Sequence, residues 1–160
     1  MYLSTESLPP QTSTDSLATL KAVFGYETFR PGQSEVIAHT LIGADSLVLM
    51  PTGGGKSLCF QLPALIREGV TVVISPLIAL MRDQVRGLQE AGVAAGALTS
   101  GNTQEETDAV WEALEAGRLK LLYMAPERLA SGAAMGMLRR IGVSMIAVDE
   151  AHCVSQWGHD

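Results

Sequence analysis

The sequence predicts an α/β fold, in which a parallel sheet is covered by helices on both faces. Short apolar segments recur at residues 70–75, 120–124 and 143–150. Between them lie segments whose apolar residues repeat at helical spacing, such as residues 77–88. A glycine-rich turn also joins a predicted strand to a predicted helix. Strands that are apolar on both faces and alternate with amphipathic helices are typical of a parallel sheet.

Length and composition exclude several classes of protein. With 160 residues, the chain can form one domain that buries about 70% of its unfolded surface. No stretch approaches the ~18 uninterrupted apolar residues of a membrane span, so we expect no membrane partner. No hydrophobic segment preceded by Lys or Arg opens the chain, and we therefore expect no secretory signal.

The formal net charge of −6 does not favour attraction of the whole surface to nucleic acid. A local groove of backbone amides, hydroxyls and a few arginines could still bind a strand. The charge therefore lowers the expectation of nucleic-acid binding without excluding it.

The two cysteines, Cys59 and Cys153, are more typical of reduced thiols in a cytoplasmic protein than of a disulfide framework. His152, Cys153 and His159 offer three candidate metal ligands in one short segment. Because a tetrahedral structural site needs four ligands, we expect no zinc in this chain.

The first elements are predicted from turn and capping residues. Residues 1–13, rich in Ser, Thr and Pro, are expected to form a disordered lead-in to a domain over residues 14–160. Thr14 or Asp15 can cap a short helix that runs to Phe24. A second helix is expected to open at Pro31 and to end at Gly43.

The remaining elements alternate along the chain. Pro63 should kink or shorten the helix that starts at Leu58. An acidic opening at Glu105 and Glu106 suits the start of a helix over residues 103–116. The predicted strands are residues 46–50, 70–75, 94–98, 120–124 and 143–150, and further helices are expected over residues 77–88 and 133–141.

The turn that follows the predicted strand 46–50 has the composition of a phosphate-binding loop. Its sequence is M-P-T-G-G-G-K-S, in which Thr52 shapes the entry and the glycines are Gly53, Gly54 and Gly55. Glycines let consecutive backbone N–H groups converge on phosphate oxygens. One position departs from the G-x-x-x-x-G-K-[ST] template, because Met50 replaces the first glycine.

Two side chains complete this loop. Lys56 would place an ammonium on the β- and γ-phosphates, and the hydroxyl of Ser57 would bind Mg²⁺. The predicted cofactors are therefore ATP and Mg²⁺. The alternative is a glycine-rich turn in which Lys and Ser occur by chance.

Asp149 and Glu150 end an almost purely hydrocarbon strand. The carboxyl end of such a strand lies at the sheet edge where phosphates bind in open α/β folds. Asp149 would hold the Mg²⁺, and Glu150 would act as the base that deprotonates the attacking water. The catalytic set is therefore Lys56, Asp149 and Glu150. Taken alone, an Asp-Glu pair after a strand would more often be solvated.

These motifs carry a resemblance to a known family. The D-E-A-H sequence from Asp149 to His152 is similar to that of superfamily 2 helicases. Five segments resemble motifs of the RecQ family of DNA helicases and occur in the order found in that family. They are F-G-Y-E-T-F-R-P-G-Q, M-P-T-G-G-G-K-S, S-P-L-I-A-L-M-R-D-Q, Y-M-A-P-E-R-L and D-E-A-H-C-V-S-Q-W-G-H-D. The resemblance runs from about Leu20 to the last residue, and it implies a RecA-like nucleotide-binding fold.

The resemblance assigns roles to further residues. Gln33 would read adenine through its amide, while Tyr26 and Arg30 would stack on the base. His152 would couple the γ-phosphate site to bound DNA, and Gln156 with Trp157 would begin an aromatic loop for an unpaired base. Contacts to the phosphodiester backbone would come from Ser75, Arg82, Thr99 and Ser100. Without the resemblance, each of these residues would pass for an ordinary surface or packing residue.

The resemblance implies ATP-driven unwinding of DNA in the 3′ to 5′ direction, acting on single-stranded and partly duplex DNA in recombination and repair. It also implies a further central strand and a second RecA-like domain beyond Asp160. We therefore expect this chain by itself to bind nucleotide weakly and not to unwind DNA. Two other hypotheses are an inactive nucleotide-binding interaction module and a D-E-A-H RNA helicase.

Overall fold

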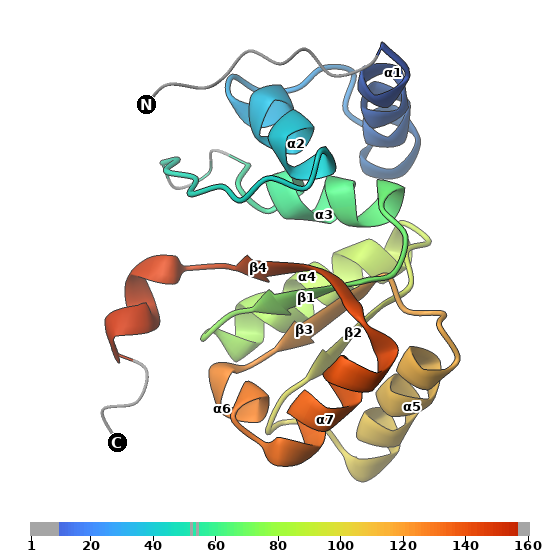
Figure 1. Ribbon diagram of the computed structural model, residues 1–160, viewed down its shortest axis with the longest axis vertical. Helices are drawn as coiled ribbons and strands as arrows, with labels where there is room; N and C mark the ends of the chain where they lie inside the picture. The colour runs from blue at the N-terminus through green and yellow to red at the C-terminus, as the bar shows by residue number, and fades with distance from the viewer. Residues whose placement is uncertain (1–9, 52, 54, 157–160) are drawn as a thin grey trace. The chain divides into compact units, whose positions relative to one another are not determined.

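The computed structural model describes residues 10–51, 53 and 55–156 (Figure 1). The chain forms two compact units, Met1–Arg67 and Glu68–Asp160. The first unit is helical, and the second contains the sheet. No helix in the described part of the chain has the length and apolar character needed to cross a bilayer.

The described residues of the first unit form four helical elements. These are α1 (Pro10–Thr19), a π-helical turn η1 (Leu20–Phe24), α2 (Gln33–Leu41) and α3 (Leu58–Ile66). Leu20, Ile37, Leu58 and Leu62 form their shared core. Helix α1 begins at Pro10, four residues before the start expected from Thr14, and proline suits the first turn of a helix because it lacks an N–H.

Helix α3 follows the glycine-rich turn and contains Pro63, as expected. It spans nine residues and ends at Ile66. Arg67 then takes an extended conformation, with its N–H donating to the carbonyl of Pro63 at 2.9 Å. The predicted short helix is confirmed.

The prediction of a strand over residues 46–50 is wrong. This segment has no regular secondary structure, and Leu47 and Leu49 are 72% and 84% exposed. An apolar sequence favours a pleated conformation only where a neighbouring strand supplies hydrogen bonds. The described sheet contains no strand paired with this segment.

The second unit contains a four-stranded sheet in the order β2-β3-β1-β4. Its strands are β1 (Val70–Ile74), β2 (Ala95–Leu98), β3 (Leu121–Met124) and β4 (Val143–Val148). All three pairings are parallel. The predicted parallel sheet is confirmed, and each of these strands falls within a predicted segment.

Helices cover both faces of this sheet. They are α4 (Ile78–Glu90), α5 (Gln104–Glu115), the short α6 (Pro126–Leu129) and α7 (Gly132–Ile141). On one face, Val72 and Leu122 join a buried cluster with Leu114 of α5 and Leu138 of α7. On the opposite face, the Tyr123 hydroxyl donates to Gln84 of α4 at 2.8 Å. Because successive side chains of a strand point to opposite faces of the sheet, the sheet packs against helices on both faces.

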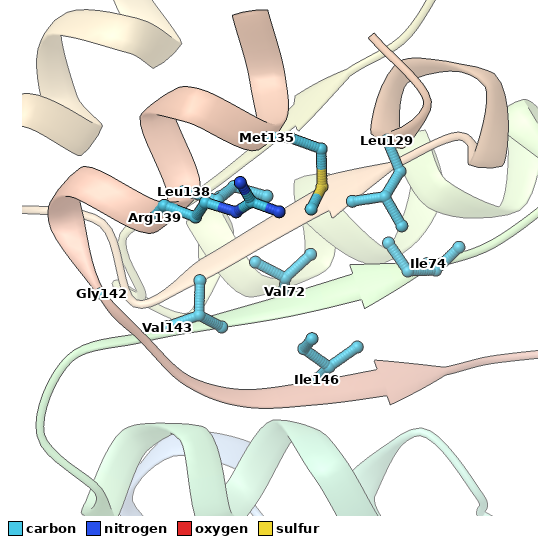
Figure 2. A pocket seen from close by; sticks show the side chains of 9 residues that line it. All are labelled: Val72, Ile74, Leu129, Met135, Leu138, Arg139, Gly142, Val143 and Ile146. Atoms are coloured by element: carbon cyan, nitrogen blue, oxygen red, sulfur yellow. The ribbon is translucent and has the colours of Figure 1, made fainter. Parts of the chain in front are cut away.

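Strand β4 is an edge strand of the described sheet, and its apolar side chains are partly uncovered. Ile146 and Val148 are 62% and 45% exposed. Figure 2 shows Ile146 beside an apolar pocket of about 370 Å³ between the sheet and helix α7. Val72 and Ile74 form the sheet side of this pocket, and Met135 and Leu138 lie opposite them.

Because all four strands are parallel, their carboxyl ends meet at one edge. The residues that follow them are Ser75 after β1, Thr99 after β2, Ala125 after β3 and Asp149 after β4. In open α/β sheets ligands bind at this edge. The topology therefore brings several of the predicted site residues of the second unit to one side of the sheet.

Candidate nucleotide and nucleic-acid site

Two glycines of the glycine-rich turn in the first unit have backbone conformations that favour glycine. Gly53 and Gly55 both have φ of +79°, which disfavours residues with a Cβ atom. Thr52 and Gly54 lie outside the described residues. The turn leads directly into α3, and the start of a helix favours bound anions.

Lys56 and Ser57 stand at the start of α3, and both are half-buried. Ser57 is the N-cap residue, yet its side chain makes no capping hydrogen bond. Its hydroxyl is therefore available to a ligand rather than used by the helix. Within the described residues, the Lys56 ammonium forms no ion pair.

The segment that precedes α2 is hydrogen-bonded to the glycine-rich turn. The Gln33 side chain is buried, and its Nε2 donates to the carbonyl of Gly55 at 3.0 Å. Its Oε1 accepts from the backbone N–H of Arg30 at 2.8 Å. The Arg30 guanidinium donates to the carbonyl of Gly53. Two segments about 20 residues apart in the sequence are thus joined at the loop.

This arrangement bears on base recognition by Gln33. Each end of its amide has one backbone partner, and a glutamine amide offers a second N–H and a second oxygen lone pair. Gln33 is only 3% exposed, however, so contact with adenine requires that its side chain move outward. Tyr26, by contrast, is 56% exposed. The structure therefore offers a stacking surface directly and a hydrogen-bonding edge only after rearrangement.

The two acidic residues of the second unit follow β4. The N–H of Asp149 donates to the carbonyl of Ile74 at 2.9 Å, which extends the parallel ladder by one residue. Its Oδ1 accepts from the N–H of Glu150 at 3.0 Å. Among the described residues, the second carboxylate oxygen of Asp149 has no hydrogen-bond partner, and a carboxylate oxygen is a ligand that Mg²⁺ accepts.

Glu150 has φ of +54°, the one positive value among the described non-glycine residues. For a residue with a long side chain this conformation costs on the order of 1 kcal/mol, and such strain is concentrated at functional sites. The Glu150 carboxylate lies 3.4 Å from Nε2 of His152 and is one-quarter exposed. His152 itself is largely exposed.

The residues after the acidic pair form a 3₁₀-helix η2 (Ala151–Gln156). The N–H of Cys153 donates to the carbonyl of Glu150 at 2.9 Å and so closes its first turn. Gln156 ends this helix, and Trp157 lies outside the described residues. The aromatic loop expected to begin at Gln156 and Trp157 therefore stays a prediction.

The four predicted backbone-contact residues differ in exposure. Ser75 and Thr99 are each 1% exposed, whereas Ser100 and Arg82 are exposed. The Ser75 hydroxyl accepts from the N–H of Leu77 at 3.4 Å. The structure thus divides this set into two buried hydroxyls and two accessible groups.

Sequence reasoning did not single out Asn102, which lies beside this set. Its side-chain amide donates to the carbonyl of Ala97 at 2.8 Å, and its Oδ1 accepts from the Thr99 hydroxyl at 3.0 Å. An asparagine between a strand and a helix is a general turn signal. The pattern alone does not show which backbone groups the asparagine will bind.

Burial also affects a thiol next to the phosphate loop. Cys59 is 5% exposed, and desolvation raises the pKa of its thiol to about 11, partly offset by a backbone hydrogen bond. The thiol is therefore protonated at neutral pH and chemically inert. Within the described residues, no group of three or more His, Cys, Asp or Glu side chains is arranged to hold a metal ion.

The chain matches a known protein family and several individual relatives. The DEAD/DEAH box helicase family matches residues 30–160. The chain therefore belongs to the DEAD/DEAH box helicase family. Within this family, the chain is similar to RecQ helicases. It is 54% identical over 145 residues to the ATP-dependent DNA helicase RecQ of Pasteurella multocida and 52% identical over 145 residues to that of Haemophilus influenzae.

A third relative, the RecQ helicase of Bacillus subtilis, is 51% identical over 138 residues. The resemblance to the RecQ family that the motifs indicated is confirmed. The first two alignments cover 91% of this chain and 23% of each relative. The chain thus spans about a quarter of the length of these curated relatives.

Proposed function

We propose that this chain forms the ATP-binding part of a RecQ-type DNA helicase. In a longer protein it would couple ATP hydrolysis to 3′ to 5′ unwinding of DNA during recombination and repair. The observation that carries the proposal is the strained turn at Asp149 and Glu150, where β4 ends in two adjacent carboxylates. A positive φ at a glutamate is kept against an energetic cost, which supports a functional role.

The nucleotide would be held mainly by the first unit. Backbone N–H groups of Gly53, Gly54 and Gly55, with Thr52 at the entry, would surround the phosphates. Lys56 would neutralise the β- and γ-phosphates. Tyr26 and Arg30 would stack on the adenine, and the buried Gln33 amide would turn outward to read its edge.

Hydrolysis would depend on the second unit as well. Ser57 and Asp149 would hold Mg²⁺, which supplies charge neutralisation at the phosphates. Glu150 would orient the attacking water and take its proton. His152, 3.4 Å from Glu150, would link this acid to the nucleic-acid side of the site.

Single-stranded DNA would run along the carboxyl edge of the sheet. The predicted backbone contacts lie at the ends of β1 and β2 or bind the turn that follows β2; they are Ser75, Arg82, Thr99 and Ser100. Gln156 with Trp157 would stack on an unpaired base. Such a local contact does not require a basic surface, which agrees with the net charge of −6. We also infer that the protein works in the cytoplasm, with its two cysteines reduced.

Nucleotide binding by the 160-residue chain tests the first part of this proposal. We expect a fluorescent ATP analogue to bind weakly and Lys56→Ala to abolish binding. Lys21→Ala removes an exposed lysine of the same unit and serves as the matched control. Equal binding by wild type and Lys56→Ala would contradict the assignment of the loop.

Turnover should be measured in a longer protein that contains this segment. We expect single-stranded DNA to stimulate ATP hydrolysis more than RNA does, and Glu150→Gln to abolish hydrolysis while nucleotide binding persists. Nucleotide binding without hydrolysis would favour an inactive interaction module instead. Stronger stimulation by RNA would favour a D-E-A-H RNA helicase.

A further inference from the structure

The turn between β2 and α5, residues 99–102, is held by an internal hydrogen-bond network. The Thr99 hydroxyl donates to Oδ1 of Asn102 at 3.0 Å and accepts from the N–H of Gly101 at 3.3 Å. Thr99 is also 1% exposed. A hydroxyl that is buried and already acts as both donor and acceptor is poorly placed to bind a phosphate directly.

Asn102 ties this turn to the strand that precedes it. Its Nδ2 donates to the carbonyl of Ala97 at 2.8 Å, and its backbone N–H donates to the carbonyl of Thr99 at 3.2 Å. Asn102, whose side chain is half-buried, therefore makes three hydrogen bonds across the turn, one of which comes from the Thr99 hydroxyl. The conformation of the turn is set before any ligand arrives.

Helix α4 reaches the same turn through Arg82. The Arg82 Nη2 donates to the carbonyl of Gly101 at 2.6 Å. A Cβ atom on residue 101 would lie 2.5 Å from this nitrogen, so a larger residue there would displace the guanidinium from its present position. One of the five guanidinium N–H donors is used here, and others remain to bind a phosphate.

Ser100 of this turn and Arg82 of α4, which binds the turn, are both exposed. Ser100 lies between the two residues, Thr99 and Gly101, whose positions the network fixes. The buried members of the network hold the exposed ones in place. This division of roles was not visible from the sequence, where all the polar residues of the turn look alike.

We propose that Asn102 is a positioning residue for nucleic-acid binding: with the Thr99 hydroxyl, it presents Arg82 and Ser100 to one phosphate of a single-stranded DNA backbone. The proposal rests on the proposed function, because it refines how that strand is bound. Asn102 itself touches no phosphate, and it acts through the conformation of residues 99–101 and the carbonyl that binds Arg82.

The test is the salt dependence of binding of a fluorescently labelled oligothymidine to the 160-residue chain. Each phosphate neutralised on a single strand contributes about 0.7 to the slope of log affinity against log salt. Arg82→Ala should lower the slope by about this amount. Asn102→Ala removes no charge, yet it should lower the slope similarly, with affinity reduced on the order of threefold to tenfold at low salt.

Several variants keep the proposal falsifiable. Thr99→Val should reproduce the effect of Asn102→Ala, and Thr99→Ser should restore wild-type binding because it keeps the hydroxyl. Arg82→Ala combined with Asn102→Ala should weaken binding by less than the sum of the two single effects, since both act on one phosphate. Gln104→Ala, an exposed residue at the start of α5, should bind as wild type does.

The outcomes separate this proposal from the proposed function. If the wild-type chain shows no salt-dependent binding of the oligonucleotide, the nucleic-acid part of the proposed function fails, and the role of Asn102 falls with it. If the wild type binds and Asn102→Ala keeps the wild-type slope, the positioning role alone is wrong. Affinity for the ATP analogue should be unchanged in all variants, and a parallel loss would show a general folding defect and overturn the proposal.

Discussion

The side-chain amide of Gln33 donates to the carbonyl of Gly55 at 3.0 Å, and this bond joins the segment before α2 to the phosphate loop. A Cβ atom on residue 55 would lie 2.3 Å from the same nitrogen. Gly55 is thus fixed both by its φ of +79° and by the approach of Gln33. Gly53 has the same φ, but nothing lies within 4 Å of a Cβ there.

This difference predicts unequal effects of two alanine substitutions. Gly53→Ala should destabilise the chain only through its φ, by about 1–2 kcal/mol. Gly55→Ala should cost more and should weaken binding of an ATP analogue further, because the added methyl also displaces Gln33. Thermal unfolding and nucleotide titration of both variants provide the measurement.

A second substitution isolates the clash at Gly55. Adding Gln33→Ala to Gly55→Ala should recover part of the lost stability, since it removes the displaced amide but leaves the φ unchanged. The same Gln33→Ala change should give no such recovery with Gly53→Ala. Additive effects in both pairs would contradict the contact between Gln33 and Gly55.

The conformation of Glu150 predicts a conflict between stability and activity. Glu150→Gly should stabilise the chain by about 1 kcal/mol, because glycine tolerates φ of +54° without strain. In a longer protein the same change should abolish ATP hydrolysis. Chemical denaturation would detect the first effect and an ATPase assay the second. Glu150→Val, with a β-branched side chain, should destabilise the chain, and a stable valine variant would argue against the strain.

The exposed edge of β4 predicts self-association of this chain. Apolar edge strands promote pairing between molecules, and a lysine on such an edge opposes it. Val148→Lys should therefore reduce concentration-dependent association in analytical ultracentrifugation. Ala109→Lys adds the same charge at an exposed position of α5 and should have no effect. Equal association of all three proteins would show that the edge is not responsible.

The two cysteines should differ in reactivity. Burial raises the pKa of Cys59 to about 11, so its thiol stays protonated at pH 8 and should be alkylated more slowly than the partly exposed Cys153. Mass spectrometry of iodoacetamide-treated protein measures both rates. Faster labelling of Cys59 would show that its surroundings open readily.

The raised pKa of Cys59 also links stability to pH. Because the folded-state pKa lies above the ordinary value of 9.0, the unfolded chain releases this proton first as pH rises. The contribution of the protonated thiol to stability is fully present below about pH 9 and is lost as pH rises towards 11. Cys59→Ala should remove this part of the pH dependence.

Much of the second unit could be predicted from the pattern of residues. Strands β1, β3 and β4 are short apolar runs, and α4 shows helical spacing of Met81, Val85 and Leu88, which are all buried. The predicted acidic opening of α5 is a capping box, in which Thr103 accepts from the N–H of Glu106 and Glu106 accepts from the N–H of Thr103. Such signals are local, so they can be read without knowing the neighbours.

The strand predicted over residues 46–50 is absent because strand formation depends on distant neighbours and not on a local signal. Leu47 and Leu49 belong to a run as apolar as β3, yet no strand lies beside them in the described sheet. A strand exists only where another strand accepts its hydrogen bonds, and a single sequence does not record which segments become neighbours.

The sequence by itself determined the chemistry that this protein can offer: a lysine and a serine after three glycines, and two adjacent acids after an apolar run. These depend on residue type and short spacing, which the chain carries directly. Only the tertiary structure decided which polar groups are free. It buried Thr99, joined Asn102 to Ala97, and bound Gln33 to Gly55. Those pairings arise because folding brings distant backbone carbonyls within hydrogen-bonding distance, and a buried polar group must take whichever partner lies there.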